Sequence, residues 1–273
     1  TTALDTSAVS NLAITAGAVT VGAGGTLTAN ASTITVSGNW NADAGTFTFG
    51  TSTVVLAATG NLDTAGTLYY VAQFYNLTIN VSVTGTLIND FGVANVTPIN
   101  GTLAGALQLG VAAGTETTVN PLVWGGSGSA TGLTRMWFLP SIDSNLPASA
   151  NYPDLTIQGE AAGVDVTVTG NVTSDGTVEL CDNAGATTLA VALGASNLTA
   201  TTTLEVGRCA GSDLDASLAS TSGVITAVAV NIRTATSFIS WGSGSHTFTG
   251  AYTNATTSAS WDAGTGTVTF TSA

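Results

Sequence analysis

The sequence predicts an all-β protein, and the architecture that it favours is a parallel β-helix or β-solenoid. Apolar and polar residues alternate with a period of two in many short segments, among them residues 18–21, 46–49 and 164–168. Such alternation is typical of strands with one buried face. Gly and Asn separate these segments at short intervals, as turn residues do, and the 3.6-residue period of a helix is nearly absent. The alternative is a pair of β-sandwich domains, which share the pattern of short strands and turns.

Threonine occupies most of the polar positions in the alternating segments, as in Thr33–Val36 (Thr-Ile-Thr-Val). A β-branched side chain suits the half-buried outer face of a pleated sheet. Residues 184–195 have the composition closest to that of a helix, but their Gly and Thr favour a strand. The whole chain is therefore expected to be built from strands.

We expect two runs of β repeats, residues 1–119 and 154–273, that form one continuous scaffold. Four of the five prolines lie between them, in residues 120–153. Proline at this density disfavours central strands, so this segment is predicted to be a long excursion from the scaffold. Its large aromatic residues are then expected to form a surface contact, and they are Trp124, Trp137 and Phe138. In the alternative interpretation, the two tryptophans cap the core.

Short motifs recur along the chain. Residues 50–56 (Gly-Thr-Ser-Thr-Val-Val-Leu) match residues 264–270 (Gly-Thr-Gly-Thr-Val-Thr-Phe), and an aromatic residue precedes each copy, Trp40 or Tyr252. A second element, Asn/Asp-Leu-x-apolar, occurs at residues 11–14, 76–79, 154–157 and 197–200. The spacing of the copies is irregular, which indicates degenerate repetition with insertions.

In these motifs, over roughly residues 10–90 and 150–273, the chain resembles the degenerate repeats of large secreted bacterial and archaeal surface proteins. Those proteins are adhesin-like and have β-helix or β-solenoid folds. The resemblance implies an extracellular role that is structural or adhesive, and it supplies no catalytic residues.

The charge of the chain excludes several classes of partner. Only 7% of its residues are charged, against about 25% in an average soluble protein. The chain has sixteen carboxylates and three arginines, which gives a net charge of −13. Such a surface repels nucleic acids and anionic lipid headgroups. No apolar run approaches the roughly 18 residues that a membrane span needs. A chain with so little charge is expected to bury much of its surface in contacts with copies of itself or beneath glycans.

The two cysteines, Cys181 and Cys209, are predicted to form a disulfide. The N-terminal residues look like a mature end after removal of a signal peptide, and a secreted protein favours disulfides. A cross-link over this loop stabilises a chain by about 3–4 kcal/mol. The alternative is two separate buried thiols. The expected location is extracellular or on a cell surface.

No catalytic, metal or cofactor site is predicted, and the chain is not expected to be an enzyme. The chain has a single histidine, His246, and the sequence predicts no strand-to-helix elbow of the kind that carries the nucleophile of a serine hydrolase. Asp213 with Asp215, or Asp262 beside Trp261, are the carboxylates that a polysaccharide-active enzyme or a calcium site would use. Lyases of that kind also need basic residues, which are scarce here.

Eight Asn-x-Ser/Thr sequons make N-linked glycans a further expectation. Turn-type neighbours favour Asn95, Asn100 and Asn254 as acceptors. The full set of sequon asparagines is Asn30, Asn76, Asn80, Asn95, Asn100, Asn171, Asn197 and Asn254.

The leading functional hypothesis is a subunit of an extracellular filament or surface array that assembles head to tail. The last repeat copy lacks the Asn-Leu-x-Ile element that should follow it, and the first residues of the chain supply that element. The N-terminal segment of one subunit is therefore expected to pair with the C-terminal strands of the next, by stacking or strand donation. The alternatives are an adhesive or carbohydrate-binding module and the polysaccharide-active enzyme. The residues expected at the joint are Val9, Asn11, Leu12, Ile14, Val268 and Phe270.

Overall fold

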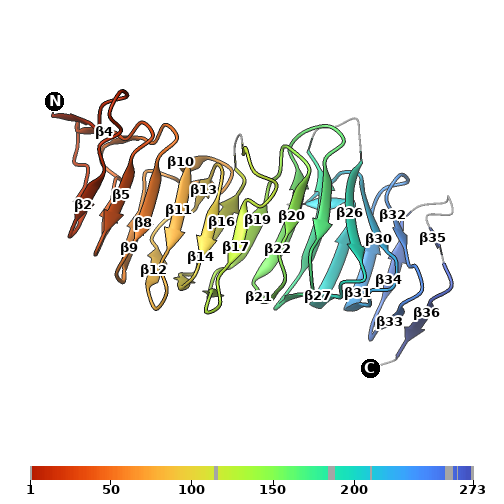
Figure 1. The fold of residues 1–273 in the computed structure, drawn as a ribbon. Helices are drawn as coiled ribbons and strands as arrows, with labels where there is room; N and C mark the ends of the chain where they lie inside the picture. Colours follow the sequence, from red (N-terminus) through yellow and green to blue (C-terminus); the bar gives the residue numbers. More distant parts are fainter. Residues whose placement is uncertain are drawn as a thin grey trace. The chain divides into compact units, whose positions relative to one another are not determined.

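The computed structural model describes residues 2–113, 116–183, 188–209, 211–255, 261–262 and 264–271, with the side chains of all but 150, 151 and 261. In this part the chain forms strands and turns but no helix, and the strand content is 52%. Parallel sheets stack as a β-solenoid of about 11 turns (Figure 1). The predicted fold is confirmed. Two β-sandwich domains are excluded, because sandwich sheets are antiparallel and the stacked strands here run parallel.

The chain forms two compact units, Thr1–Arg135 and Met136–Ala273. In the first unit each sheet collects strands from successive turns. One six-stranded sheet contains β2 (Ile14–Ala16), β5 (Thr33–Val36), β8 (Thr53–Leu56), β11 (Asn76–Ile79), β14 (Thr97–Ile99) and β17 (Leu122–Trp124). The other contains β3 (Val19–Thr20), β6 (Trp40–Asn41), β9 (Gly60–Asp63), β12 (Thr84–Leu87), β15 (Thr102–Ala104) and β18 (Ser129–Thr131). The remaining strands form two shorter ladders, β1 (Ala3–Asp5), β4 (Thr26–Thr28) and β7 (Thr46–Thr48), and β10 (Ala72–Phe74), β13 (Phe91–Val93) and β16 (Gln108–Val111).

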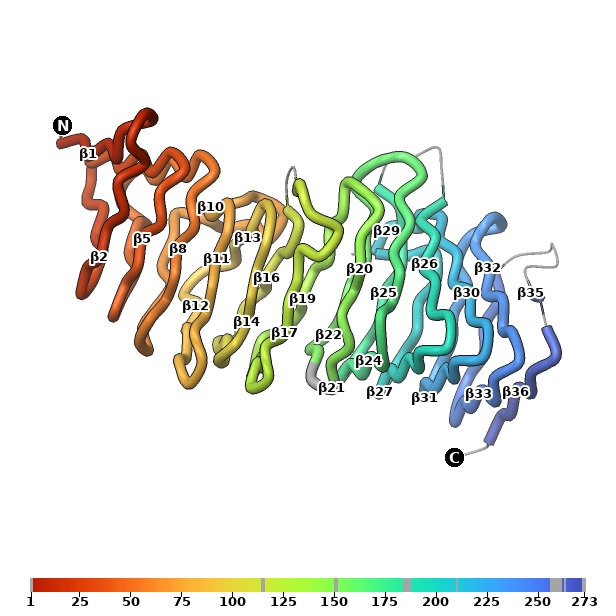
Figure 2. The backbone as a smooth tube through the Cα atoms, in the orientation of Figure 1, coloured from red at the N-terminus to blue at the C-terminus, as the bar shows by residue number. Residues whose placement is uncertain are grey.

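The second unit begins within β19 (Arg135–Phe138) and has two principal sheets. The first contains β20 (Ser144–Leu146), β23 (Asp165–Val168), β26 (Leu189–Gly194), β30 (Ala216–Ser220), β32 (Phe238–Ser240) and β35 (Trp261–Asp262). The second contains β21 (Ser149–Tyr152), β22 (Asp154–Gly159), β24 (Val172–Ser174), β25 (Val178–Asp182), β27 (Leu198–Val206), β31 (Ile225–Ile232), β33 (Ser245–Phe248), β34 (Tyr252–Asn254) and β36 (Thr267–Phe270). An antiparallel hairpin joins β28 (Arg208–Cys209) to β29 (Ser212–Asp213), which is labelled in Figure 2. The described part of the chain contains no helix that could cross a membrane.

The alternation in the sequence becomes columns of side chains in the solenoid. Ile14 pairs with Ile34, Ile34 with Val54, and Val54 with Leu77, each one turn further on. The last three of these side chains are buried, while residues that alternate with them along the same strand, such as Thr35, are partly exposed. The backbone ladder and the apolar column thus hold successive turns together, and both follow from the period of two.

Residues 120–153 do not leave the scaffold, in contrast to the prediction. Their strands β17, β18, β20 and β21 pair in parallel with strands one turn away. The prolines fall between strands, as Pro121 does before β17 and Pro147 does after β20. At such corners the backbone N–H is not needed for the ladder. The prolines therefore mark corners of the solenoid.

At many corners a side chain supplies the acceptor that the backbone ladder lacks. The side-chain Oδ1 of an asparagine accepts a hydrogen bond from a backbone N–H of the next turn, at 2.8–3.2 Å. Asp90, Asp143 and Asp154 do the same through a carboxylate oxygen. The asparagines are Asn11, Asn39, Asn76, Asn95, Asn171 and Asn197. Corner amides and carboxylates therefore connect turns where the strands end.

Candidate functional site

The predicted disulfide between Cys181 and Cys209 is confirmed. Cys181 lies in β25 and Cys209 in the hairpin, and both residues are buried. The Cα atoms are 5.7 Å apart. The bridge ties the hairpin to the sheet of the second unit. A disulfide is compatible with an oxidising, extracellular environment.

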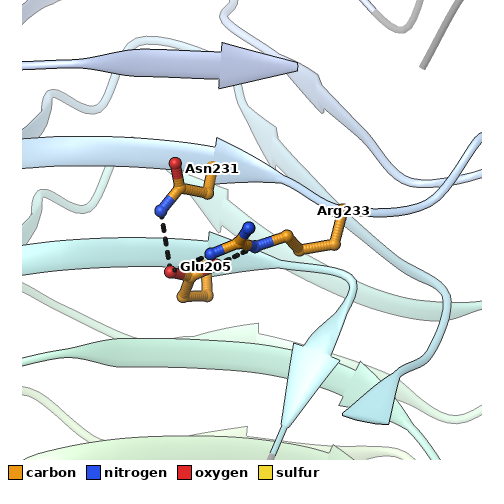
Figure 3. A network of polar contacts seen from close by, with 3 residues as sticks. All are labelled: Glu205, Asn231 and Arg233. Carbon is orange, nitrogen blue, oxygen red and sulfur yellow. Dashed lines mark hydrogen bonds and ion pairs between the residues drawn. The ribbon is translucent and has the colours of Figure 1, made fainter. Parts of the chain in front are cut away.

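Glu205, Asn231 and Arg233 form a polar network across two turns of the second unit (Figure 3). Arg233 donates from Nε to Oε2 of Glu205 at 2.6 Å and from Nη2 to Oε1 at 2.9 Å, and Asn231 Nδ2 donates to Oε1 at 2.7 Å. The hydrogen bond with Glu205 raises the pKa of Arg233 above its ordinary value, and Asp213 of the hairpin adds to this rise. Because both Glu205 oxygens are engaged in this charge-assisted pair, the network joins turns and offers no free acid or base. The sequence pattern gave no sign of this pair, whose members lie one turn apart.

His246 is buried in the core of the second unit, at a position next to Ile225 of one turn and Val268 of another. The backbone N–H of Ile225 donates to Nδ1 at 3.0 Å, and Nε2 donates to the carbonyl oxygen of Trp241 at 2.7 Å. The imidazole is therefore neutral, with its proton on Nε2. Burial lowers the pKa of His246 below its ordinary value of 6.5. With both nitrogens bound to backbone, this side chain is a core element.

We expect the second unit to lose stability as the pH falls below 6.5, the ordinary pKa of histidine. The folded pKa is lower, so the unfolded chain takes up its proton first. The stabilisation is complete above 6.5 and is lost as the pH falls toward the folded pKa. Denaturation measured between about pH 5 and 7 checks this, because carboxylates titrate mainly below that window. His246→Gln, which keeps an acceptor and a donor, should be insensitive to pH there; the same slope in both proteins would contradict the role of His246.

The carboxylates singled out from the sequence lie in or directly after the hairpin strand β29 and in β35. Asp213 lies opposite Arg208 in the hairpin, and Asp262 accepts a hydrogen bond from Ser240 Oγ at 2.8 Å. The side chain of Trp261 lies outside the described residues, and Asp215 is partly buried. No group of three or more His, Cys, Asp or Glu side chains in the described ranges could hold a metal ion.

The aromatic residues predicted to form a surface contact lie mostly inside the protein. Trp137 and Phe138 of β19 are buried, whereas Trp124 of β17 is partly buried. Trp137 and Phe138 therefore belong to the core, which for Trp137 agrees with the alternative interpretation of the two tryptophans. The surface contact was wrong for these two because they lie within a scaffold strand.

The residues predicted for assembly lie in two places. In the first unit, Val9 and Leu12 are exposed, Asn11 accepts the corner hydrogen bond from Ala31, and Ile14 lies in β2. In the second unit, Val268 pairs with His246, and Phe270 is 51% exposed. The ring of Phe270 packs against Phe248 at 5.7 Å and Tyr252 at 6.0 Å between centroids.

An apolar groove of about 360 Å³ lies beside the turn that contains β1, β2 and β3. Its apolar lining consists mainly of Leu4, Ile14, Val19, Val21, Leu27 and Ile34, and none of its lining residues is charged. Leu4 is 57% exposed. Sequence reasoning missed the groove as a unit, because its residues come from different turns.

The eight sequon asparagines differ in exposure. Asn95 is buried, Asn171 is exposed, and the other six, Asn30, Asn76, Asn80, Asn100, Asn197 and Asn254, are partly buried. Three of them provide corner acceptors that connect turns, in addition to Asn95: Asn76, Asn171 and Asn197. The structure therefore explains much of the sequon pattern as corner chemistry.

The chain matches no protein-family model, no curated protein and no solved structure. Its class is defined by its fold, a parallel β-solenoid with a disulfide-tied hairpin.

Proposed function

We propose that the chain is a structural subunit of an extracellular filament or surface array whose copies stack end to end. In this proposal it is related in role to the adhesin-like surface proteins of bacteria and archaea that its repeats resemble, and it has no catalytic activity. The burial of His246 and the neutralisation of Glu205 by Arg233 support the absence of catalysis.

The observation that carries the proposal is the uncharged, apolar groove beside β1, β2 and β3. Within the solenoid, the corresponding face of a turn adjoins the preceding turn, as Ile34 adjoins Ile14. Leaving Leu4 and its neighbours in water costs free energy in proportion to the apolar area. In our proposal, a turn from a second copy covers the groove.

The exposed face of β36 is suited to such a contact. Phe270 offers a large apolar side chain, and the other residues of the strand, Thr267, Val268 and Thr269, carry no charge. Copies with a net charge of −13 repel one another, so a joint between uncharged surfaces keeps the carboxylates apart. Strand addition also satisfies backbone groups at the sheet edges.

This contact would join two different surfaces, the groove of one copy and β36 of another, because each added copy would continue the stack in the same direction. A heterologous contact of this kind gives an open fibre unless rotation closes it into a ring. The parallel ladders of the stacked sheets in both units make such repetition natural, because each added turn presents the same hydrogen-bonding pattern.

The second candidate function is an adhesive module, which one surface loop favours. The loop between β9 and β10 exposes Leu68, Tyr70 and Val71. Its Tyr69 carbonyl lies so close to Gly110 that a Cβ there would be 1.9 Å from the oxygen. The loop is thus seated on a position that requires glycine, and it presents an apolar, aromatic patch of the kind found at contact sites.

The substitution Leu4→Asp tests end-to-end assembly. We expect it to abolish or strongly shorten the fibres seen by negative-stain microscopy, because a carboxylate buried in an apolar joint has no partner. The matched control is Val81→Asp, at a residue of the same unit that is 66% exposed and does not line the groove; its fibres should equal those of the wild type.

Two outcomes would count against the proposal. Fibres of Leu4→Asp as abundant as those of the wild type would exclude the groove as the joint. A wild-type protein that stays monomeric at every concentration would exclude self-assembly and favour the adhesive module.

A further inference from the structure

The sequon asparagines divide by what their side-chain nitrogen does. N-linked glycosylation attaches the sugar to Nδ2 and leaves Oδ1 as an acceptor. An asparagine can therefore keep a hydrogen bond through Oδ1 while it carries a glycan, but its Nδ2 must face space that a sugar can fill. Four of the eight sequon asparagines differ clearly in this respect.

Three sequon asparagines use Nδ2 in hydrogen bonds to other side chains of the protein. Asn95 Nδ2 donates to Asn76 Oδ1 at 2.9 Å, and Asn76 Nδ2 donates to Thr53 Oγ1 at 3.1 Å. Asn30 Nδ2 donates to Asp5 Oδ1 at 2.7 Å. Asn95 is moreover only 8% exposed. These residues connect neighbouring turns, and a sugar on Nδ2 would have to displace the partner. Asn95, which its turn-type neighbours favoured as an acceptor, is therefore inaccessible.

Asn171 has the opposite arrangement. It is the exposed member of the eight, all of which the structure describes. Its Oδ1 accepts a hydrogen bond from the backbone N–H of Asn197 at 2.9 Å, which holds the amide in place. Within the described residues, no hydrogen bond involves its Nδ2. The corner bond and a glycan can therefore coexist at this residue.

The surroundings of Asn171 also suit a glycan. Thr173, the hydroxyl residue of the sequon, begins a column in which Thr199, Thr226, Thr247 and Thr269 follow in register, one from each turn. The column has no charged member, and its spacing is about 4.8 Å per turn. A glycan beside it would keep an uncharged sheet face hydrated and separated from the same face of other copies.

We propose that Asn171 is an N-glycan acceptor and that the amides of Asn30, Asn76 and Asn95 serve the fold instead. This inference rests on the proposed extracellular role, since N-linked glycans are added to secreted chains. The ligand class is a covalent oligosaccharide linked to Nδ2.

The test uses the full chain secreted from eukaryotic cells, with glycopeptide mapping and intact mass of the folded, secreted fraction. We expect a glycan on the Asn171 peptide and bare peptides at Asn30, Asn76 and Asn95. Asn171→Gln and Thr173→Val should each remove one glycan from the intact mass. Thr173→Val keeps both the β-branched shape and Asn171, so it separates loss of the acceptor signal from loss of the corner amide.

Asn197→Gln is the matched control, because Asn197 lies at the same corner one turn later and accepts from Val224 N–H. It should leave the glycan on Asn171 in place. A bare Asn171 peptide, or a glycan on Asn30, Asn76 or Asn95, would overturn the inference. Microscopy of the same material reports on assembly separately, so fibres with a bare Asn171 would contradict this inference alone, whereas glycosylated monomers would contradict the proposed function alone.

Discussion

Replacing Trp40 with alanine is expected to destabilise the first unit by about 3–5 kcal/mol, the usual cost of truncating a buried tryptophan. Trp40 lies in β6 and is completely buried. Its ring centroid is 4.7 Å from that of Phe47 and 5.5 Å from that of Phe74. The truncation leaves a cavity among these rings. Because a turn of a solenoid contacts only its neighbouring turns, few other side chains can fill that cavity. Urea denaturation followed by circular dichroism measures the loss.

Trp40→Phe is the control for this experiment. It keeps an aromatic ring, and it removes an indole Nε1 that is buried without a hydrogen-bond partner among the described residues. Removing that unsatisfied group offsets part of the lost packing, so the loss should be clearly smaller than for alanine. Equal losses for the two variants would contradict the aromatic packing explanation.

Removing the disulfide should destabilise the second unit by about 3–4 kcal/mol, since the bridge closes a loop between residues 28 apart in the sequence. The double variant Cys181→Ala and Cys209→Ala tests this, because alanine leaves no free thiol to re-pair. Without the bridge the unfolded chain gains freedom, and the hairpin loses its covalent attachment to β25. The measurement is the denaturant midpoint without reductant.

The comparison that completes this experiment is reduced wild-type protein, whose midpoint should approach that of the double variant. A double variant as stable as the oxidised wild type would show that the hairpin packs equally well without the bridge. It would also remove the energetic argument for an oxidising environment.

The strands and their faces could be predicted because the alternation that defines them is local. Residues 33–36, read as a strand with an apolar inner face, form β5 with Ile34 and Val36 buried. Within residues 184–195, read as strand despite a helix-like composition, Leu189–Gly194 forms β26, while 184–187 lie outside the described residues. The cysteine pairing was equally accessible, because two cysteines allow one intramolecular bridge.

The register of the repeats was harder to predict, and the motif at residues 11–14 shows why. Aligned by motif, Ile14 corresponds to Ile79, but the ladders place Ile14 in the column of Leu77, two residues earlier. A shift of two residues leaves every side chain on the same face. Alternation therefore cannot distinguish the two alignments. The number of residues in each turn decides between the two alignments, and this number varies because the corners differ in length.

By itself, the sequence determined that this protein is a stack of short strands with apolar inner faces, little charge and one disulfide, because each of these properties follows from nearest neighbours or from composition. Only the tertiary structure decided which side chains meet across turns. Glu205 meets Arg233 28 residues later, and Asn171 meets Asn197 26 residues later. The physical reason is that these contacts join residues one full turn apart, and the length of a turn is set by how its corners pack and hydrogen-bond.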